Sequence, residues 1–298
     1  MTAAAAVVFV APMVFSGGAC SGARAPRDGD ARARVAAALA PGAVAAALAK
    51  LGDAHWRAKA RFSVGRPGPA GWTEGVTTTT DVWLDRAGNY RLVEGNDADG
   101  GREVVLYGRE LNVALRYYGK MIRRRAEEPE PSRLLAEAVS APGAAWDLVG
   151  HFAGLDPLPA APVNGRPAAG FQLSRSQSAP EPAATGTAGE DPLRSWRQTV
   201  QLHRLEGEVR LDEATSAPLT VVVRAAYGLK RDGHDLRGEI DLRADIDGVG
   251  STPAIARPDA AEDLPVRQRT VPEERALLGG LGGQPTSAAA GKRAERRP

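Results

Sequence analysis

Alternating apolar and polar residues mark the second half of the chain as long β-strands. The stretch LRGEIDLRADID at 236–247 places a charged residue at nearly every second position, and LTVVVRAAYGLK at 219–230 also alternates. The turn RDG at 231–233 separates the two stretches. A period of two puts successive side chains on opposite faces, so one face of this hairpin is apolar and the other meets water. The apolar face is predicted to hold Leu219, Val221, Val223, Ala225, Tyr227, Leu229, Leu236, Gly238, Ile240, Leu242, Ala244 and Ile246.

Shorter alternating stretches occupy the first half of the chain. VTTTTDVWL at 76–84 places Val76, Thr78, Thr80, Val82 and Leu84 on one face, and ELNVALRYY at 110–118 places Leu111, Val113, Leu115 and Tyr117 on one face. Turn sequences such as DRAGN at 85–89 separate them. We expect about eight or nine strands in two groups, 56–118 and 166–249, which short turns join into an antiparallel meander. Gly238 interrupts an apolar face, which predicts a bend or bulge there.

Two segments read as helices rather than strands. Residues 36–51 form an alanine-rich stretch that Pro41-Gly42 breaks, and residues 131–155 carry Trp146, Val149 and Phe152 at helical spacing. A sheet with one apolar face must cover that face, and these helices are the obvious cover. The predicted fold class is therefore mainly β with helices: a strongly curved antiparallel sheet, or incomplete β-barrel, wrapped around a short helical segment.

Composition sets the limits of this single domain at residues 34–255. Residues 176–192 contain no large apolar side chain and predict a disordered insertion. Residues 256–298 end in the basic sequence GKRAERRP and predict a largely disordered tail.

The N-terminus carries the only cysteine, Cys20. An uncharged apolar run at 3–15 is shorter than the roughly 20 residues that span a membrane, and the small residues SGGAC follow it. The segment resembles a bacterial lipoprotein signal peptide, although Gly17 replaces the usual leucine and no Lys or Arg precedes the run. The resemblance implies a signal peptide at 1–19, a lipid attached to Cys20, and a tether over 20–33. An ordinary secretory cut after Ala23-Arg24-Ala25, or a cytoplasmic chain, are the alternatives.

The strand and helix order, together with two sequence stretches, resembles the periplasmic lipoprotein carrier and receptor superfamily. The stretches are GNYRLVEG followed by VVLYGRELNVALRYYGK, and LEGEVRLDEATSAPLTVVV. The resemblance covers about residues 35–255 and implies a cavity that holds the acyl chains of lipids or lipoproteins. An unrelated antiparallel barrel or sandwich behind the same signal peptide is the alternative.

Patterns that carry catalytic chemistry are missing from the sequence. It has no G-x-S-x-G, no P-loop, and four histidines without metal-binding spacing, so we expect no enzyme, no cofactor and no metal. The net charge of +2 gives no drive toward nucleic acid. The cluster RRR at 123–125 allows a contact with anionic lipid headgroups, but an exposed strand end balanced by EEPE at 127–130 is the favoured interpretation.

The sequence therefore predicts a non-catalytic protein of the bacterial cell envelope, lipid-anchored and facing the periplasm, that binds a lipid or acyl chain. Its partners would be the membrane, through the acyl chains, and either a lipid or an envelope protein. The residues predicted to line the cavity are Leu115, Tyr117, Trp146, Phe152, Val223 and Ile240. For each of them simple core packing is the alternative, which would make the protein a structural or protein-interaction lipoprotein with a filled core. An envelope hydrolase is the weakest alternative.

Overall fold

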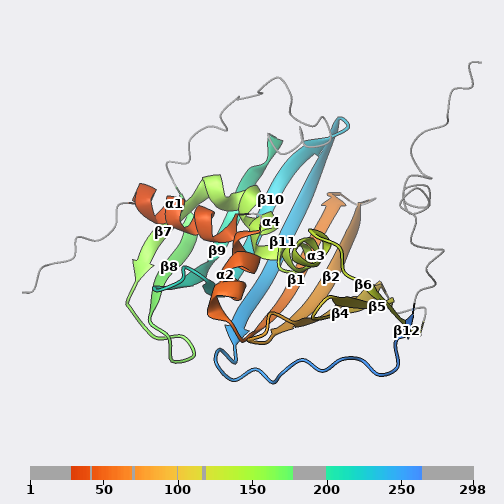
Figure 1. Cartoon of the computed structure of the whole chain (residues 1–298). Helices are drawn as coiled ribbons and strands as arrows, with labels where there is room; N and C mark the ends of the chain where they lie inside the picture. The colour runs from red at the N-terminus through yellow and green to blue at the C-terminus, as the bar shows by residue number, and fades with distance from the viewer. Residues whose placement is uncertain are drawn as a thin grey trace, which may run out of the picture.

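The computed structural model describes residues 28–40, 42–68, 71–98, 100–115, 119–176 and 199–263 (Figure 1). The helices are α1 (Asp28–Leu39), α2 (Ala43–Leu51), α3 (Glu130–Ala138) and α4 (Ala141–Val149), and a 3-10 turn, η1 (Gly150–Phe152), follows α4. The strands are β1 (Ala54–Arg66), β2 (Trp72–Leu84), β3 (Tyr90–Asn96), β4 (Gly101–Tyr107), β5 (Glu110–Leu115), β6 (Met121–Arg125), β7 (Ala153–Leu158), β8 (Ala168–Arg175), β9 (Gln201–Asp212), β10 (Pro218–Arg231), β11 (His234–Asp247) and β12 (Glu262–Asp263). The predicted signal peptide, Cys20, Tyr117, residues 177–192 of the predicted insertion and the tail from 264 lie outside the described residues.

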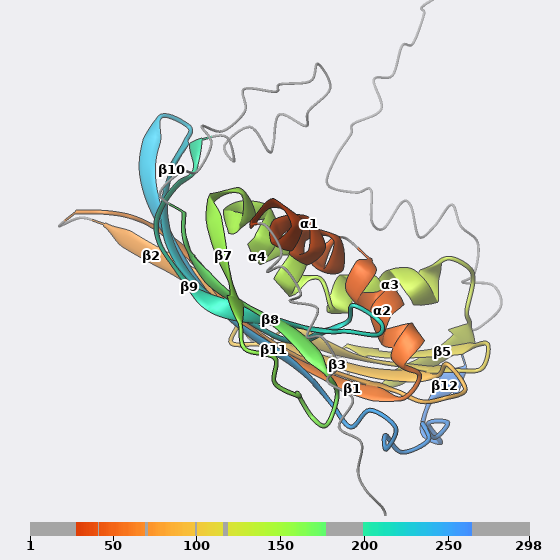
Figure 2. The ribbon, with the colours of Figure 1, turned by 90° about the vertical axis from the view of Figure 1, so that its left-hand side faces the viewer.

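All twelve of these strands belong to one sheet, in the order β12-β6-β5-β4-β3-β2-β1-β11-β10-β9-β8-β7. Neighbours are antiparallel except β12, which pairs with β6 in parallel. The sheet curves strongly and the four helices lie on its concave side (Figure 2). The end strands β12 and β7 do not pair with each other, so the sheet stays open. The predicted fold class, a curved antiparallel sheet around helices, is confirmed.

Strand β7 differs from the sequence prediction. We expected residues 131–155 to be helical, but helix α4 ends at Val149 and the chain is a strand from Ala153. The helical period fails there because Gly150 and Gly154 disfavour a continuous helix, while Ala153 and Leu155 alternate with polar or exposed positions and pack inward. The extra strand completes the edge of the sheet beside β8.

Strand register places the predicted apolar faces together on the concave side. Trp56 lies opposite Ile246 of β11 and Val82 of β2, and all three side chains are fully buried. The same face continues through Leu92 and Val104 on β3 and β4. The convex face carries the alternate residues of these strands, most of which are polar or charged. The core is therefore the space between the concave face and the helices.

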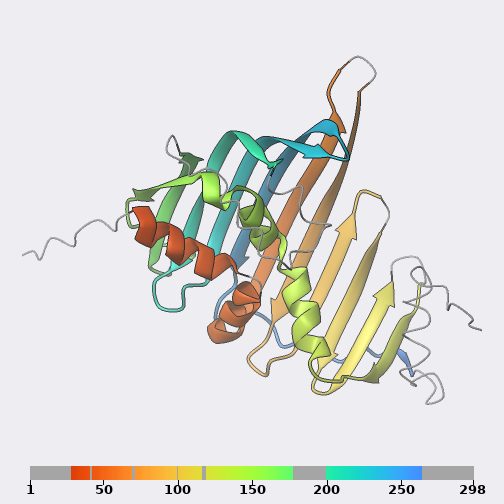
Figure 3. The same cartoon turned by 90° about the horizontal axis from the view of Figure 1, so that it is seen from above.

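Helices cover only part of that concave face. Helix α4 contacts β10 and β11, α1 contacts β7 and β9, and α3 contacts β3. Viewed from above, the β1–β2 and β10–β11 hairpins extend beyond the helices (Figure 3). Helix α1 begins at Asp28, inside the segment 20–33 that the sequence predicts as a tether, and buries Ala31 and Val35 against the core.

Gly238 does not mark a bulge, which is one of the two irregularities predicted there. Pairing of β11 with both β10 and β1 runs through Gly238 without a shift, and the irregularities lie between β9 and β10 instead. A Cβ atom at Gly238 would lie 2.3 Å from Cζ of Tyr227. The glycine therefore leaves room for the Tyr227 ring to lie across the sheet.

The chain after β11 runs along the ends of the strands (Figure 1). The Gly250 amide donates to Asp53, the Ile255 amide donates to Asp85, and Arg257 pairs with Glu110 at 2.6 Å. Strand β12 then joins the sheet edge at β6. Residues 256–263, at the start of the predicted tail, are thus bonded to the domain.

Candidate functional site

An apolar pocket of about 600 Å³ lies on the concave face where the two hairpins extend beyond the helices. We call it the hairpin pocket. Its apolar lining is Phe62, Val64, Trp72, Val76, Tyr227, Leu229 and Leu236. Ser63, Glu74, Gly75, Arg231, Asp232 and His234 complete the wall. The volume is in the range of small-molecule and lipid-chain sites.

Strand pairing explains why these side chains meet. Phe62 lies opposite Val76, and Leu229 lies opposite Leu236, so each pair occupies the same face of its hairpin. Because no helix lies above this end of the sheet, Trp72 and Val76 remain 44% and 43% exposed. Among the described residues they are two of the three large apolar side chains that are exposed to this degree. Such a concentration of exposed apolar surface is typical of a binding site.

Tyr227 forms the buried floor of the pocket. The residue is 5% exposed, and burial raises the pKa of its phenol. The phenol is therefore neutral at physiological pH and adds an apolar ring with one hydroxyl group. Arg231 and Asp232, at the β10–β11 turn, form an exposed ion pair at 3.6 Å. Glu74, which lies opposite Val64 on the concave face, adds a carboxylate to the lining.

A second pocket, of about 510 Å³, adjoins the first along β2. We call it the polar pocket. Its lining is Thr78, Thr80, Glu94, Gly95, Asn96, Gly101, Arg102, Leu115, Glu137, Ala138, Ser140 and Ala141. Thr80, Glu94, Arg102 and Leu115 form a row across β2, β3, β4 and β5, because each is the register partner of the next. This row marks where the concave face changes from apolar to polar.

Four of the residues predicted to line a cavity lie in or against the core cluster. Val223 and Ile240 lie in the core, at 0% and 2% exposure, and Trp146 of α4 is also buried. Phe152 is half-buried against the core in η1. None of these four lines the hairpin pocket, whereas Leu115 lines the polar pocket. Tyr117 lies outside the described residues, so its role stays a prediction.

Sequence reasoning missed Trp72, Val76 and Phe62. Val76 was placed on the correct face of its strand, but nothing in the alternation shows whether a helix covers that position. A signal was present in the position of Trp72, directly after the turn GPAG at 68–71. A large aromatic residue beside a hairpin turn is poorly placed for a core and well placed for a surface site.

The arginine cluster at 123–125 is largely occupied by contacts within the protein. Arg123 donates to Asn112 at 3.1 Å and to the carbonyl of Pro258. Arg124 pairs with Glu130, which belongs to the predicted balancing segment 127–130. The geometry therefore favours the interpretation of a strand end balanced by acidic residues.

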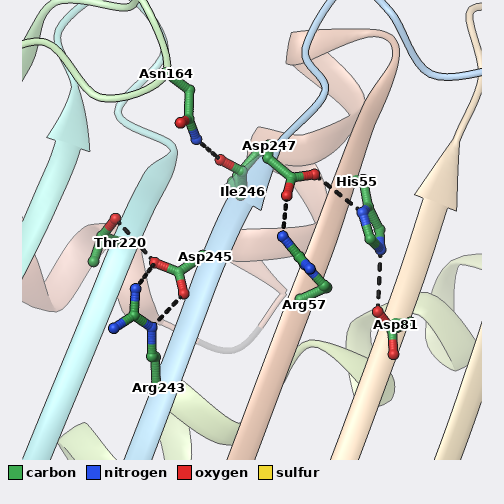
Figure 4. A network of polar contacts seen from close by, with 9 residues as sticks. All are labelled: His55, Arg57, Asp81, Asn164, Thr220, Arg243, Asp245, Ile246 and Asp247. Carbon is green, nitrogen blue, oxygen red and sulfur yellow. Dashed lines mark hydrogen bonds and ion pairs between the residues drawn. The ribbon is translucent and has the colours of Figure 1, made fainter.

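A polar network joins three strands on the convex face (Figure 4). His55 contacts Asp81 on β2 at 3.1 Å and Asp247 on β11 at 3.0 Å, and its ring stacks on Trp83 at 4.6 Å. Arg57 also pairs with Asp247. Because both ring nitrogens face carboxylates, the imidazole is bound from two sides and links β2, β1 and β11. Its contacts are structural, and it lies on the face opposite the pockets.

The described residues offer neither a cluster of metal ligands nor a single membrane-spanning helix. No group of three or more His, Cys, Asp or Glu side chains among them is arranged to hold a metal ion. Within the same ranges no single helix is long and apolar enough to cross a membrane, although α1 and α2 together pass that test as a pair bent by 79°.

Solved structures similar to this chain include members of the superfamily that the sequence resembles. A LolA superfamily protein from Nitrosomonas europaea is 10% identical over 77% of this chain and 98% of its own, with a TM-score of 0.21. A putative outer membrane lipoprotein-sorting domain from Vibrio parahaemolyticus is 10% identical over 72% of this chain and 91% of its own, with a TM-score of 0.20. A chain of the MucA/MucB complex of Pseudomonas aeruginosa is 14% identical over 76% of this chain and 64% of its own, with a TM-score of 0.24.

No family model matches the sequence, and no curated protein sequence is similar to it. The solved structures are too distant to carry function to this chain. Its function is therefore proposed from its own sequence and pockets.

Proposed function

We propose that this protein is a non-catalytic, lipid-anchored protein of the bacterial cell envelope that faces the periplasm and binds the acyl chain of a lipid in the hairpin pocket. The observation that carries the proposal is the apolar pocket itself, about 600 Å³ in volume, with Trp72 and Val76 exposed in its wall. Soluble domains rarely leave such surface uncovered unless a partner or ligand covers it.

Burial of an acyl chain supplies enough free energy for binding. Each buried methylene contributes about 0.8 kcal/mol, so about ten of them contribute roughly 8 kcal/mol, which corresponds to a micromolar Kd before ordering costs are subtracted. The apolar side chains of the pocket offer no competing hydrogen bonds. A ligand that is mostly hydrocarbon therefore suits the site better than a polar metabolite.

Anchoring through Cys20 is proposed from the sequence. The apolar run at 3–15 and the small residues before Cys20 support it, and residues 21–27 separate Cys20 from α1. Three acyl chains would hold the domain stably at a membrane. Incorporation of radiolabelled palmitate into the full-length chain tests this claim: we expect labelling that Cys20→Ala abolishes. Labelling that persists in Cys20→Ala would contradict it.

A structural or protein-interaction lipoprotein is the second candidate. One observation favours it: the helix-covered part of the concave face is filled, with Val223, Leu242 and Ile246 fully buried. In that case the hairpin pocket would accept apolar side chains of an envelope protein rather than a lipid.

Ligand binding separates the two candidates. We expect protein purified without detergent to release a lipid that mass spectrometry detects, and to bind a fluorescent fatty acid. Val76→Glu places a charge in the wall of the pocket and should lower fatty-acid affinity by at least about tenfold, because the carboxylate must be desolvated. Thr79→Glu is the matched control, since Thr79 lies on the convex face of the same strand and opposite Lys59.

Equal losses in Val76→Glu and Thr79→Glu would mean that the fatty acid binds elsewhere. A protein that releases no lipid and binds no fatty acid would overturn the lipid proposal and leave the protein-interaction candidate.

A further inference from the structure

The hairpin pocket and the polar pocket lie next to each other along β2 on the concave face. Val76 lines the first, and Thr78, on the same face of β2, lines the second. Alternate residues on a strand lie about 7 Å apart, so the two pockets adjoin. The wall of the hairpin pocket is mainly apolar, and that of the polar pocket is mainly polar. A ligand that fills both must itself have an apolar part and a polar part.

Charges in and beside the polar pocket are balanced in pairs. Arg102 bonds to Glu94 and lies 3.8 Å from Glu137, and Arg133 also lies 3.8 Å from Glu137. Two cations thus face two carboxylates. An entering group of a single sign would displace one partner and leave it unpaired, which is unfavourable in a partly buried site. A group that carries both signs can exchange partners with the Arg102–Glu94 pair and leave no charge unpaired.

Thr80 adds a hydroxyl group to the polar pocket. The residue is 8% exposed, lines the pocket and lies opposite Glu94 in the row across the strands. A threonine hydroxyl can both donate and accept a hydrogen bond, so it can bind a polar ligand group. The first residue of α4, Ala141, also lines this pocket, and free amide groups at a helix start favour anions such as phosphate.

We propose that the ligand is a zwitterionic amphiphile that carries a phosphate and an amine, a proposal that rests on the acyl-chain function given above. Its acyl chain lies in the hairpin pocket. Its phosphate meets Arg102, the Thr80 hydroxyl and the first turn of α4, and its ammonium group meets Glu94. The polar pocket is thereby a headgroup site that selects among lipids with identical chains.

Matched probes test the headgroup site. Lysophosphatidylethanolamine, lysophosphatidylglycerol and the free fatty acid, all with one chain length, are compared by displacement of a fluorescent fatty acid. Soluble glycerophosphoethanolamine, which has the headgroup without the chain, is the fourth probe. We expect the zwitterionic lysolipid to bind about tenfold more tightly than the other two chains, as one charge-assisted hydrogen bond would give. The soluble headgroup should bind at least about a hundredfold more weakly, because it buries no chain.

Variants locate the effect. Arg102→Gln with Glu94→Gln removes both charges together, so neither is left unpaired, and should abolish the preference, measured as the ratio of the lysolipid and fatty-acid affinities. Arg91→Gln with Glu103→Gln is the matched control, because that ion pair joins the same two strands on the convex face at 2.8 Å. Thr80→Val keeps the side-chain shape and should lower the preference by a few-fold; it serves as the second variant if the double substitution impairs folding.

The outcomes separate this proposal from the function on which it rests. If no acyl probe binds, the lipid function fails and the headgroup site fails with it. If the three chain-bearing probes bind equally, the lipid function stands and the headgroup site is overturned. Tight binding of soluble glycerophosphoethanolamine would also overturn the shared-ligand proposal, since the polar pocket would then serve a free phosphoamine.

Discussion

Strands β1, β10 and β11 each cross two regions of the concave face that differ in what lies above them. In the covered region, α4 packs on β10 and β11, and Leu242, Ala244 and Ile246 are fully buried. In the uncovered region, near the hairpin turns, the same alternation continues through Leu236, but the neighbouring Val76 of β2 is 43% exposed. The same pattern of residues therefore makes a core in one place and a pocket in the other. The helices, not the strands, decide which is made.

Truncation of one apolar residue in each region should have the largest effect: it should lower stability in the covered region and fatty-acid affinity in the uncovered one. Leu242→Ala removes a fully buried side chain and should lower the free energy of unfolding by about 2–5 kcal/mol. Val76→Ala removes a half-exposed one and should change it by less than about 1 kcal/mol, with the loss falling on fatty-acid affinity instead. Urea denaturation and fatty-acid titration measure the two effects. Similar stability losses in both variants would show that the uncovered region is also core.

Acid should weaken the end of the sheet at the β9–β10 turn through Asp212. Burial opposes ionisation of this carboxyl, but hydrogen bonds from Arg166 and Thr215 outweigh it and lower its pKa to about 2. Because the pKa is lower than in the unfolded chain, the ionised carboxylate stabilises the fold above about pH 4, and that stability is lost as the pH falls toward 2. The shift corresponds to roughly 2 kcal/mol.

Stability measured by urea denaturation at a series of pH values checks this. Arg166→Met should flatten the decline between pH 4 and 2, and Arg224→Met is the control, since its pair with Asp241 is exposed. An unchanged decline in Arg166→Met would rule out this pair as its source.

A methyl group at Gly238 should affect both regions, because Tyr227 lies where the core meets the hairpin pocket. The new Cβ would lie 2.3 Å from Cζ of Tyr227, so the ring that forms the pocket floor must move. We expect Gly238→Ala to lower stability by about 1–3 kcal/mol and to weaken fatty-acid binding. Gly228→Ala is the control, because its Cβ would meet only the end of the His203 side chain, at 3.0 Å. Unchanged fatty-acid affinity in Gly238→Ala would mean that Tyr227 is not the floor of the binding site.

Much of the fold could be predicted from the sequence because strand alternation is a local property. The faces of the stretches 76–84, 219–230 and 236–247 were assigned correctly, and so was the placement of helices against the apolar face. Strand β7 was missed because its six residues, AGLDPL, follow a helix closely and contain a proline. The C-terminal contacts of residues 248–263 were missed because single hydrogen bonds to distant strand ends leave no periodic signal.

The apolar character of the candidate site could be predicted from the sequence, but its position and lining residues could not. The sequence determined an alternating apolar face, the helical segments available to cover it, and a cysteine suited to acylation, because each depends on residues close together in the chain. Tertiary structure alone decided that the helices stop short of the hairpin ends. That placement made Val223 and Ile240 part of the core, exposed Trp72 and Val76 in a pocket, and set the polar row of Thr80, Glu94 and Arg102 beside it. Whether a helix covers a strand depends on how elements distant in the sequence pack, and the alternation of residues within one strand does not indicate this.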